Sequence, residues 1–215
     1  MDEKFYDNLK EKIKPYFEGI NSCHDFSHTE RVLNLALQIA KKEKGVDLEA
    51  IKISALLHDI ARKEQDESKG KICHAIRGAE IARGLLEELK IEEKIIKEVI
   101  HCIKTHRFRN DDLPQTKEAM ILYDADKLDS IGGIGILRSA SFGGSVGAIV
   151  HNPEVEPKKE NAYTKEDSAY HEYLYKLCKI KNKMLTEEGK KIAEQRHGYM
   201  NDFFDRVNKE VKGEL

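Results

Sequence analysis

The chain has 215 residues, of which 40% are hydrophobic, and a chain of this length and composition can bury one full core. Its 37 Lys and Arg residues nearly balance its 39 Asp and Glu residues, which leaves a formal net charge of −2 at pH 7. No overall field therefore favours a nucleic-acid polymer or an anionic membrane as a partner, and we expect one domain over residues 1–215.

The N-terminal segment MDEKFYDNLK contains acidic residues and no apolar run, and no stretch of about 18 consecutive apolar residues occurs. The sequence thus predicts neither a secretion signal nor a membrane span, and we expect a cytoplasmic location. The four cysteines, Cys23, Cys73, Cys102 and Cys178, lie far apart without a C-x-x-C pair. We expect reduced thiols rather than a zinc ribbon or a disulfide framework.

Apolar residues recur at three- and four-residue steps along several segments, which is the spacing of a helix with one buried face. One such stripe predicts a helix over residues 28–44. Its members are Val32, Leu35, Ala36, Ile39 and Ala40. The same pattern predicts helices over 2–18, 48–61, 72–89, 92–106 and 116–130, two of them with the N-caps Asp47 and Thr116. Since no alternating strand pattern competes, we predict an all-α fold.

Three polar segments are predicted to interrupt the helices: residues 63–71, 107–115 and 151–161. The glycine-rich stretch 131–147 lacks a G-x-G-x-x-G after a strand, so it is a weak indication of nucleotide binding. We expect it to allow close helix packing and to form a loop over the site.

The C-terminal part is predicted to form a closing hairpin of two helices, over 165–181 and 187–211. We accordingly divide the domain into a core over 20–145 and a C-terminal helical extension over 162–213. Phe203 and Phe204 lie on an apolar stripe of the last helix. Closing the core is the commoner use of such a stripe, and contact with a second copy in a homodimer is the alternative.

A catalytic divalent cation needs neutral imidazoles and carboxylates that rigid elements hold in place. The candidates for these ligands are His28, His58 and Asp59. His58 and Asp59 are adjacent at the end of the apolar helix IKISALLHDIA. Adjacent helical residues point about 100° apart, so both face one cation only at a helix end or in a distorted turn. The dipeptide alone is uninformative, because His24 and Asp25 repeat it by chance or for local capping.

Five motifs accompany these residues: HDFSHTERV at 24–32, ALLHDIAR at 55–62, HAIRGAE at 74–80, THRF at 105–108 and DADKLDSIGGIGILR at 124–138. In this set the chain resembles the HD superfamily, and most of all the small bacterial and archaeal HD phosphohydrolases with an H-D-x-x-H-T-x-R-V start and a D-A-D-[KR]-L-D segment. The likeness covers about residues 20–205. It implies an HD-domain helical bundle that hydrolyses phosphate esters or nucleotide phosphoanhydrides.

The resemblance implies that four residues hold a divalent cation: His28, His58, Asp59 and Asp126. Alignment on A-D-K-L favours Asp126 over Asp124, whose alternative role is that of an exposed or capping carboxylate. Manganese, cobalt, magnesium or iron suits these donors, whereas the lack of thiolate ligands argues against structural zinc.

Basic residues lie beside these ligands in the sequence and are predicted to offset phosphate charge: Arg62, Lys63 and Lys127. The alternative for each is a solvated surface charge. Asp129 is expected to bind a sugar hydroxyl or to orient a ligand. Relatives that act on nucleoside monophosphates or alarmones carry Glu at the position of Arg62, which argues against those substrates, and the lack of a G-Y-P signature argues against cyclic dinucleotides.

His74 and His106 stand where relatives with two metals carry further histidines, so we predict that they bind a second cation or hydrogen-bond the phosphate. His106, near a helix end, is preferred to His101. The remaining histidines are expected to be structural: His151, His171 and His197.

These residues predict metal-assisted hydrolysis, in which Asp59 orients the attacking water while Lys127 and Arg62 offset charge on the phosphate. By resemblance the substrate is a small phosphorylated molecule, first of all a nucleotide, and pyrophosphate release from a nucleoside triphosphate is the more specific prediction. Two alternatives stay open. A di-iron oxygenase of the HD fold would add His74 and His106 as ligands, and a non-catalytic protein would bind metal or ligand without turnover.

Overall fold

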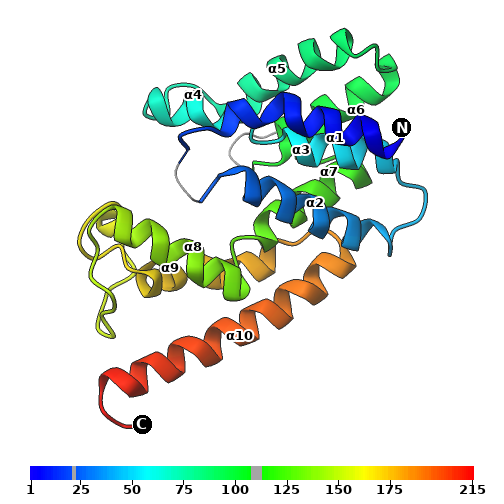
Figure 1. Ribbon diagram of the computed structural model, residues 1–215. Coiled ribbons are helices and arrows are strands. Elements are labelled where there is room, and N and C mark those ends of the chain that lie inside the picture. Colours follow the sequence, from blue (N-terminus) through cyan, green and yellow to red (C-terminus); the bar gives the residue numbers. More distant parts are fainter. Residues whose placement is uncertain (21–22, 108–112) are drawn as a thin grey trace. The chain divides into compact units, whose positions relative to one another are not determined.

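The computed structural model describes residues 1–20, 23–107 and 113–215, and over these residues every regular element is a helix (Figure 1). The predicted all-α fold is therefore confirmed. None of the described helices is long and apolar enough to span a membrane. The chain divides into two compact units, residues 1–126 and 127–215. This boundary differs from the predicted core limit at residue 145, and the single domain stays a prediction.

The first unit consists of α1 (Glu3–Ile13), η1 (Lys14–Phe17), α2 (Phe26–Ala40), α3 (Leu48–Leu57), α4 (Arg62–Glu67), α5 (His74–Glu88), α6 (Glu93–Thr105) and nearly all of α7 (Lys117–Leu128). α3 packs against α2 and α6, and α5 packs against α6. The C-terminal half of α3 carries apolar side chains that are fully buried: Ile51, Ile53, Ala55, Leu56 and Leu57. A helix of this kind lies in the centre of a bundle, so its C-terminal end delivers the following residues into the interior.

The two N-caps that the sequence predicted are confirmed. The Asp47 side chain accepts hydrogen bonds from the backbone N–H groups of Glu49 and Ala50 at 2.9 and 3.1 Å. Thr116 Oγ1 accepts one from the backbone N–H of Ala119 at 3.2 Å. Each cap satisfies N–H groups that the first helical turn leaves without an intrahelical partner.

The polar segment 63–71 was wrongly predicted to be a break, because α4 occupies most of it. Lys, Glu and Gln have high helix propensity in spite of their polarity. α3 in turn ends at Leu57 and not at residue 61. Most of the predicted break at 107–115, together with Phe108 of the THRF motif, lies outside the described residues.

The second unit contains α8 (Gly132–Ser145), η2 (Lys159–Asn161), α9 (Ala169–Tyr175), η3 (Leu177–Lys183) and α10 (Glu187–Val211). The loop expected over 131–147 is wrong, since α8 fills this stretch. Gly135 is needed for close packing, because an added Cβ would lie 2.3 Å from the carbonyl oxygen of Ser130. The helix predicted over 165–181 is divided into α9 and η3, because Lys176 leaves the helical conformation with φ of −133°.

α10 has the predicted bounds and packs against α8 and η3 within the second unit. The Thr186 side chain caps it by accepting a hydrogen bond from the backbone N–H of Gly189 at 3.0 Å. On its apolar stripe Met200 and Phe204 are buried, while Phe203 is 36% exposed. Phe204 thus closes the core of this unit, and a homodimer stays a prediction.

Candidate metal and phosphate site

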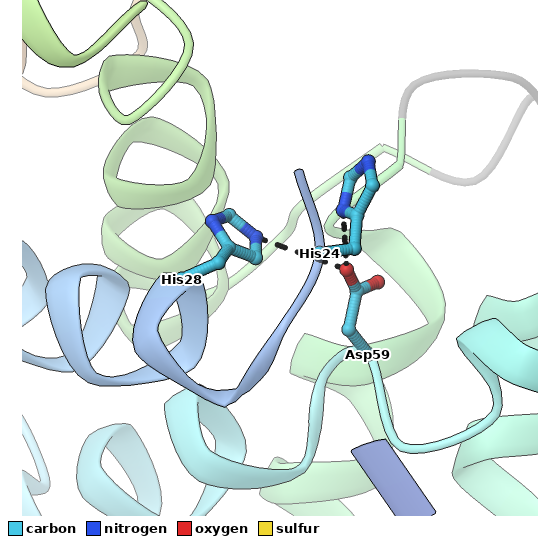
Figure 2. Close-up of side chains that lie close together, drawn as sticks. All are labelled: His24, His28 and Asp59. Atoms are coloured by element: carbon cyan, nitrogen blue, oxygen red, sulfur yellow. Dashed lines mark hydrogen bonds and ion pairs between the residues drawn. The ribbon is translucent and has the colours of Figure 1, made fainter. Parts of the chain in front are cut away.

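The motif HDFSH brings two histidines together at the start of α2. Asp25 is the N-cap, and its Oδ1 accepts hydrogen bonds from the backbone N–H of His28 at 3.0 Å and from Ser27 Oγ at 2.6 Å. The ring centroids of His24 and His28 lie 5.3 Å apart. Figure 2 shows both rings beside the Asp59 carboxylate. Local capping therefore explains Asp25, whereas the contact of His24 with Asp59 was missed by the sequence analysis.

His58 and Asp59 lie where α3 stops, as their adjacency required. His58 is the C-cap of α3, and the chain then turns, with the Ile60 N–H donating to the carbonyl of Leu57 at 3.2 Å and the Arg62 N–H to that of Asp59 at 2.8 Å. Both side chains are buried, with 0% of His58 and 3% of Asp59 exposed. The turn allows two successive side chains to enter the same interior space.

A first group of donor atoms comes from His28, His58 and Asp126. His28 Nε2 lies 3.3 Å from His58 Nε2 and 3.5 Å from Asp126 Oδ1. His58 Nδ1 donates to the carbonyl of Ala55 at 2.8 Å, so its Nε2 turns a lone pair toward this group. Burial lowers the pKa of His58 to about 4, although Asp59 acts in the opposite direction. The ring is therefore neutral at pH 7, which metal binding requires.

A second group comes from Asp59, His74 and His106. His74 Nδ1 donates to Gln65 Oε1 at 2.8 Å, and His106 Nδ1 donates to the carbonyl of Ile103 at 2.6 Å. These contacts leave the Nε2 atom of each ring turned toward the Asp59 carboxylate, and the two Nε2 atoms lie 3.1 Å apart. Burial, more than any other cause, lowers the pKa of His74. The arrangement brings two imidazole nitrogens and a carboxylate oxygen to one place.

The Asp59 carboxylate of the second group also faces the histidines of the first group. Its Oδ2 is 2.9 Å from His24 Nδ1 and faces the Nε2 atoms of His28 and His58 at 3.7 and 3.8 Å. Its Oδ1 is 3.1 Å from His74 Nε2. Burial alone would raise the pKa of Asp59, but the surrounding histidines, His58 first, hold it well below its usual range. The carboxylate is therefore ionised, and each oxygen serves a different group.

The donors of both groups fit divalent cations. Within each group the ligand atoms lie within 4.8 Å of one another, and they are imidazole nitrogens and carboxylate oxygens. A cation between facing lone pairs removes their repulsion, and such donors suit manganese, iron, cobalt or magnesium. Asp126 belongs to the first group, whereas Asp124 is fully buried, so the exposed role considered for Asp124 is wrong.

Arg62 lies close to the cluster. Burial first, and the positive charge of Arg62 in addition, lowers the pKa of His24 and the pKa of His74. Its Nε is buried and lies 3.4 Å from Asp66 Oδ1 without forming a hydrogen bond in the described structure. The ion pair with Asp66 is thus the contact that the described residues give to this buried donor.

The other residues predicted to bind substrate have different surroundings. Lys63 Nζ donates to the carbonyl of Glu18 at 3.0 Å on the surface of the first unit. Asp129 belongs to the second unit, is buried, and accepts a hydrogen bond from Arg138 at 2.8 Å through Oδ2. Lys127 directly follows Asp126 in α7. A role of these residues in substrate binding stays a prediction.

The histidines that the sequence analysis set aside make other contacts. His101 Nε2 accepts a hydrogen bond from the backbone N–H of Gln115 at 3.1 Å, and it belongs to neither group of donors. His171 is fully buried in the second unit, with Nδ1 3.1 Å from Asp167 Oδ1. These contacts agree with the preference for His106 and with a structural role for His171.

Residues 25–131 match the family model of the HD domain. The crystal structure of an HD-superfamily hydrolase from Bacillus thuringiensis is similar with a TM-score of 0.75 and 30% identity, over 97% of both chains. The chain belongs to the HD superfamily, and its fold is that of a metal-dependent hydrolase. The resemblance found in its motifs is thereby confirmed.

Two further relatives extend over different shares of the chain. The protein YpgQ of Bacillus subtilis is 29% identical over 211 residues, which cover 94% of both chains. Its crystal structure in complex with ADP gives a TM-score of 0.73 at 26% identity, over 95% of this chain and 98% of that chain. Ribonuclease Y of Chloroflexus aurantiacus is 34% identical over 108 residues, but these cover 47% of this chain and 19% of that protein.

Proposed function

We propose that this protein is a metal-dependent phosphohydrolase that cleaves a phosphoanhydride bond of a nucleotide. The observation that carries the proposal is that the Asp59 carboxylate faces the histidines of both groups, with Oδ2 3.7 Å from His28 Nε2 and Oδ1 3.1 Å from His74 Nε2. The nucleotide is supported by the likeness to YpgQ, which is crystallised in complex with ADP. Release of pyrophosphate from a nucleoside triphosphate is the more specific form of the proposal.

In the proposed site the catalytic cation, manganese in the first place, is held by His28, His58, Asp59 and Asp126. A divalent cation there lowers the pKa of a water molecule and neutralises charge on the phosphate. The chain contributes neutral imidazoles whose direction is fixed, in His58 by the Nδ1–H bond to Ala55. Asp59 accepts a hydrogen bond from the attacking water and so orients it.

We assign His74 and His106 to a second cation rather than to the phosphate. The Nδ1 of each ring is engaged with an oxygen, which leaves the two Nε2 atoms, 3.1 Å apart, as the ring nitrogens that can bind a cation. Asp59 Oδ1, 3.1 Å from His74 Nε2, adds negative charge at this place. This environment attracts a cation and repels a phosphate.

Arg62 and Lys127 are the residues proposed to bind the phosphate. The buried Nε of Arg62 offers a donor beside the cluster, and the guanidinium matches the geometry of phosphate oxygens. Lys127 follows Asp126 directly in the chain, and it is proposed on that position alone. The electrostatic interaction of both side chains with the phosphoryl oxygens would become more favourable as negative charge develops on the transferred group.

The test uses chelator-stripped protein reloaded with manganese. Phosphate and pyrophosphate release are measured from nucleoside mono-, di- and triphosphates and from a short RNA. We expect turnover of a nucleotide that Asp59→Ala abolishes, while Asp202→Ala, an exposed carboxylate of α10, leaves it unchanged. Cleavage of the RNA alone, or no release although the wild type binds manganese, would contradict the nucleotide substrate.

A di-iron oxygenase is a second candidate, because the two groups bring six donors of the required kind together: His28, His58, Asp59, His74, His106 and Asp126. Such an enzyme needs iron and consumes dioxygen. Nucleotide hydrolysis by the manganese form in the absence of oxygen would exclude that function. Oxygen uptake by the iron form, without any phosphate release, would favour it.

A further inference from the structure

His24 is outside the four ligands proposed for the catalytic cation, yet it makes a close contact with one of them. His24 Nδ1 lies 2.9 Å from Asp59 Oδ2, closer than the 3.7 Å that separates His28 Nε2 from the same oxygen (Figure 2). A carboxylate oxygen at this distance accepts a hydrogen bond, so Nδ1 is the donor in this contact. The contact is therefore a hydrogen bond from His24 to a metal-binding oxygen.

We propose that His24 is a positioning residue that fixes the direction of the Asp59 carboxylate. A carboxylate turns readily about its last torsion, and Asp59 has to direct Oδ2 to the first group while Oδ1 serves the second. The N–H of His24 occupies one lone pair of Oδ2 and leaves the other for the cation. The proposal rests on the proposed function in one respect, namely that the cluster binds a divalent cation.

The start of α2 holds His24 in place for this role. Asp25 caps the helix through its bonds to the His28 N–H and to Ser27 Oγ, which fixes the backbone on both sides of the cap. One turn of chain thus carries the positioning histidine, the capping aspartate and a ligand histidine in the order of the H-D-x-x-H motif. The first histidine of that motif, which had no function in the sequence analysis, obtains one.

Direct ligation by His24 is the competing interpretation, because its Nδ1 also lies within 4.8 Å of donor atoms of His28 and Asp59. The two interpretations differ in what they require of the nitrogen. A ligand must lose the proton and offer a lone pair, whereas a positioning residue must keep the proton. Asparagine places an amide N–H where histidine has Nδ1–H, and an amide nitrogen is a poor metal ligand.

The experiment measures manganese affinity from the electron paramagnetic resonance signal of the free ion. We expect His24→Ala to weaken binding by about 10- to 100-fold, the loss typical of an outer-sphere partner, and His24→Asn to recover most of it. Wild-type affinity in His24→Ala would overturn the proposal. So would His24→Asn that binds as weakly as His24→Ala, because the nitrogen would then act as a ligand.

Two controls separate this result from other failures. His197→Ala removes a partly exposed histidine of the second unit and should leave manganese affinity unchanged. Circular dichroism and thermal unfolding of the variants show whether the fold is intact. If the wild type binds no manganese, the proposed function is overturned as well. If the wild type and His24→Ala bind manganese with the same high affinity, only the role of His24 is overturned.

Discussion

The Nε2 atoms of His74 and His106 lie 3.1 Å apart although the Nδ1 of each ring is already engaged with an oxygen. Because both Nε2 atoms also face Asp59 Oδ1, at 3.1 and 3.8 Å, we expect a second cation between these three groups, and His106→Ala should reduce the bound manganese from two ions per chain to one. Equilibrium dialysis with metal analysis measures this number. His101→Ala on the same helix is the control and should keep two ions. An unchanged number in His106→Ala would assign His106 to the phosphate instead.

Gln65 is expected to support the second cation without touching it. Its side-chain oxygen accepts the Nδ1–H of His74 at 2.8 Å and so directs the Nε2 lone pair of that ring to the cluster. Gln65→Leu should lower the affinity for the second manganese ion by about 10- to 100-fold and leave the affinity for the first ion unchanged. Stepwise binding isotherms resolve the two events. Equal weakening of both ions would mean that the substitution disturbs α4 as a whole.

The stability of the metal-free protein should fall at acidic pH. Burial lowers the pKa of His58 to about 4, below the usual 6.5. Between these values the unfolded chain binds a proton at this position that the folded chain does not bind, so acid favours unfolding. We expect the free energy of unfolding to be level above pH 6.5 and to decrease from there toward pH 4. Urea unfolding of chelator-treated protein at several pH values measures it, and His58→Gln should give a flatter profile.

The position of the candidate ligands His58 and Asp59 at a helix end was predictable from the sequence, and the contact of Asp59 with His24 was not. The apolar run before His58, followed by two adjacent polar residues, required a helix end, and α3 does end at Leu57. His24 contacts Asp59 from 35 positions away in the chain. That contact depends on how α2 packs against α3, and this packing cannot be predicted from a local sequence pattern.

Composition also misled the assignment of two helices. The segment of α4 is polar, and its helix is anchored by a single buried side chain, Gln65, in contact with His74. α8 is rich in glycine, which in isolation disfavours helix, but packing within the second unit selects the helix. In both cases tertiary contacts decided the structure, and the sequence shows those contacts only through residues distant from the segment.

Gly135 should be required for the stability of the second unit. A Cβ at this position would lie 2.3 Å from the Ser130 carbonyl oxygen, and overpacking of this kind costs about 1–3 kcal/mol. Thermal unfolding should therefore show a lower midpoint for Gly135→Ala. Gly144 lies in the same helix, and an added Cβ there meets nothing within 4 Å. Gly144→Ala should accordingly be neutral or stabilising by up to about 1 kcal/mol, and a loss equal to that of Gly135→Ala would contradict the steric argument.

Arg62 and Lys63 are adjacent cations for which the structure predicts different effects on catalysis. The buried Nε of Arg62 is available beside the histidine cluster, whereas Lys63 donates to the Glu18 carbonyl on the surface. If Arg62 stabilises charge developing on the phosphoryl group, Arg62→Ala should lower kcat/KM of the manganese form for its nucleotide by about 100-fold. Lys63→Ala should change it little, and both variants should bind manganese as the wild type does. Equal losses in the two variants would indicate a general electrostatic attraction of the substrate, and salt would then reduce both losses in parallel.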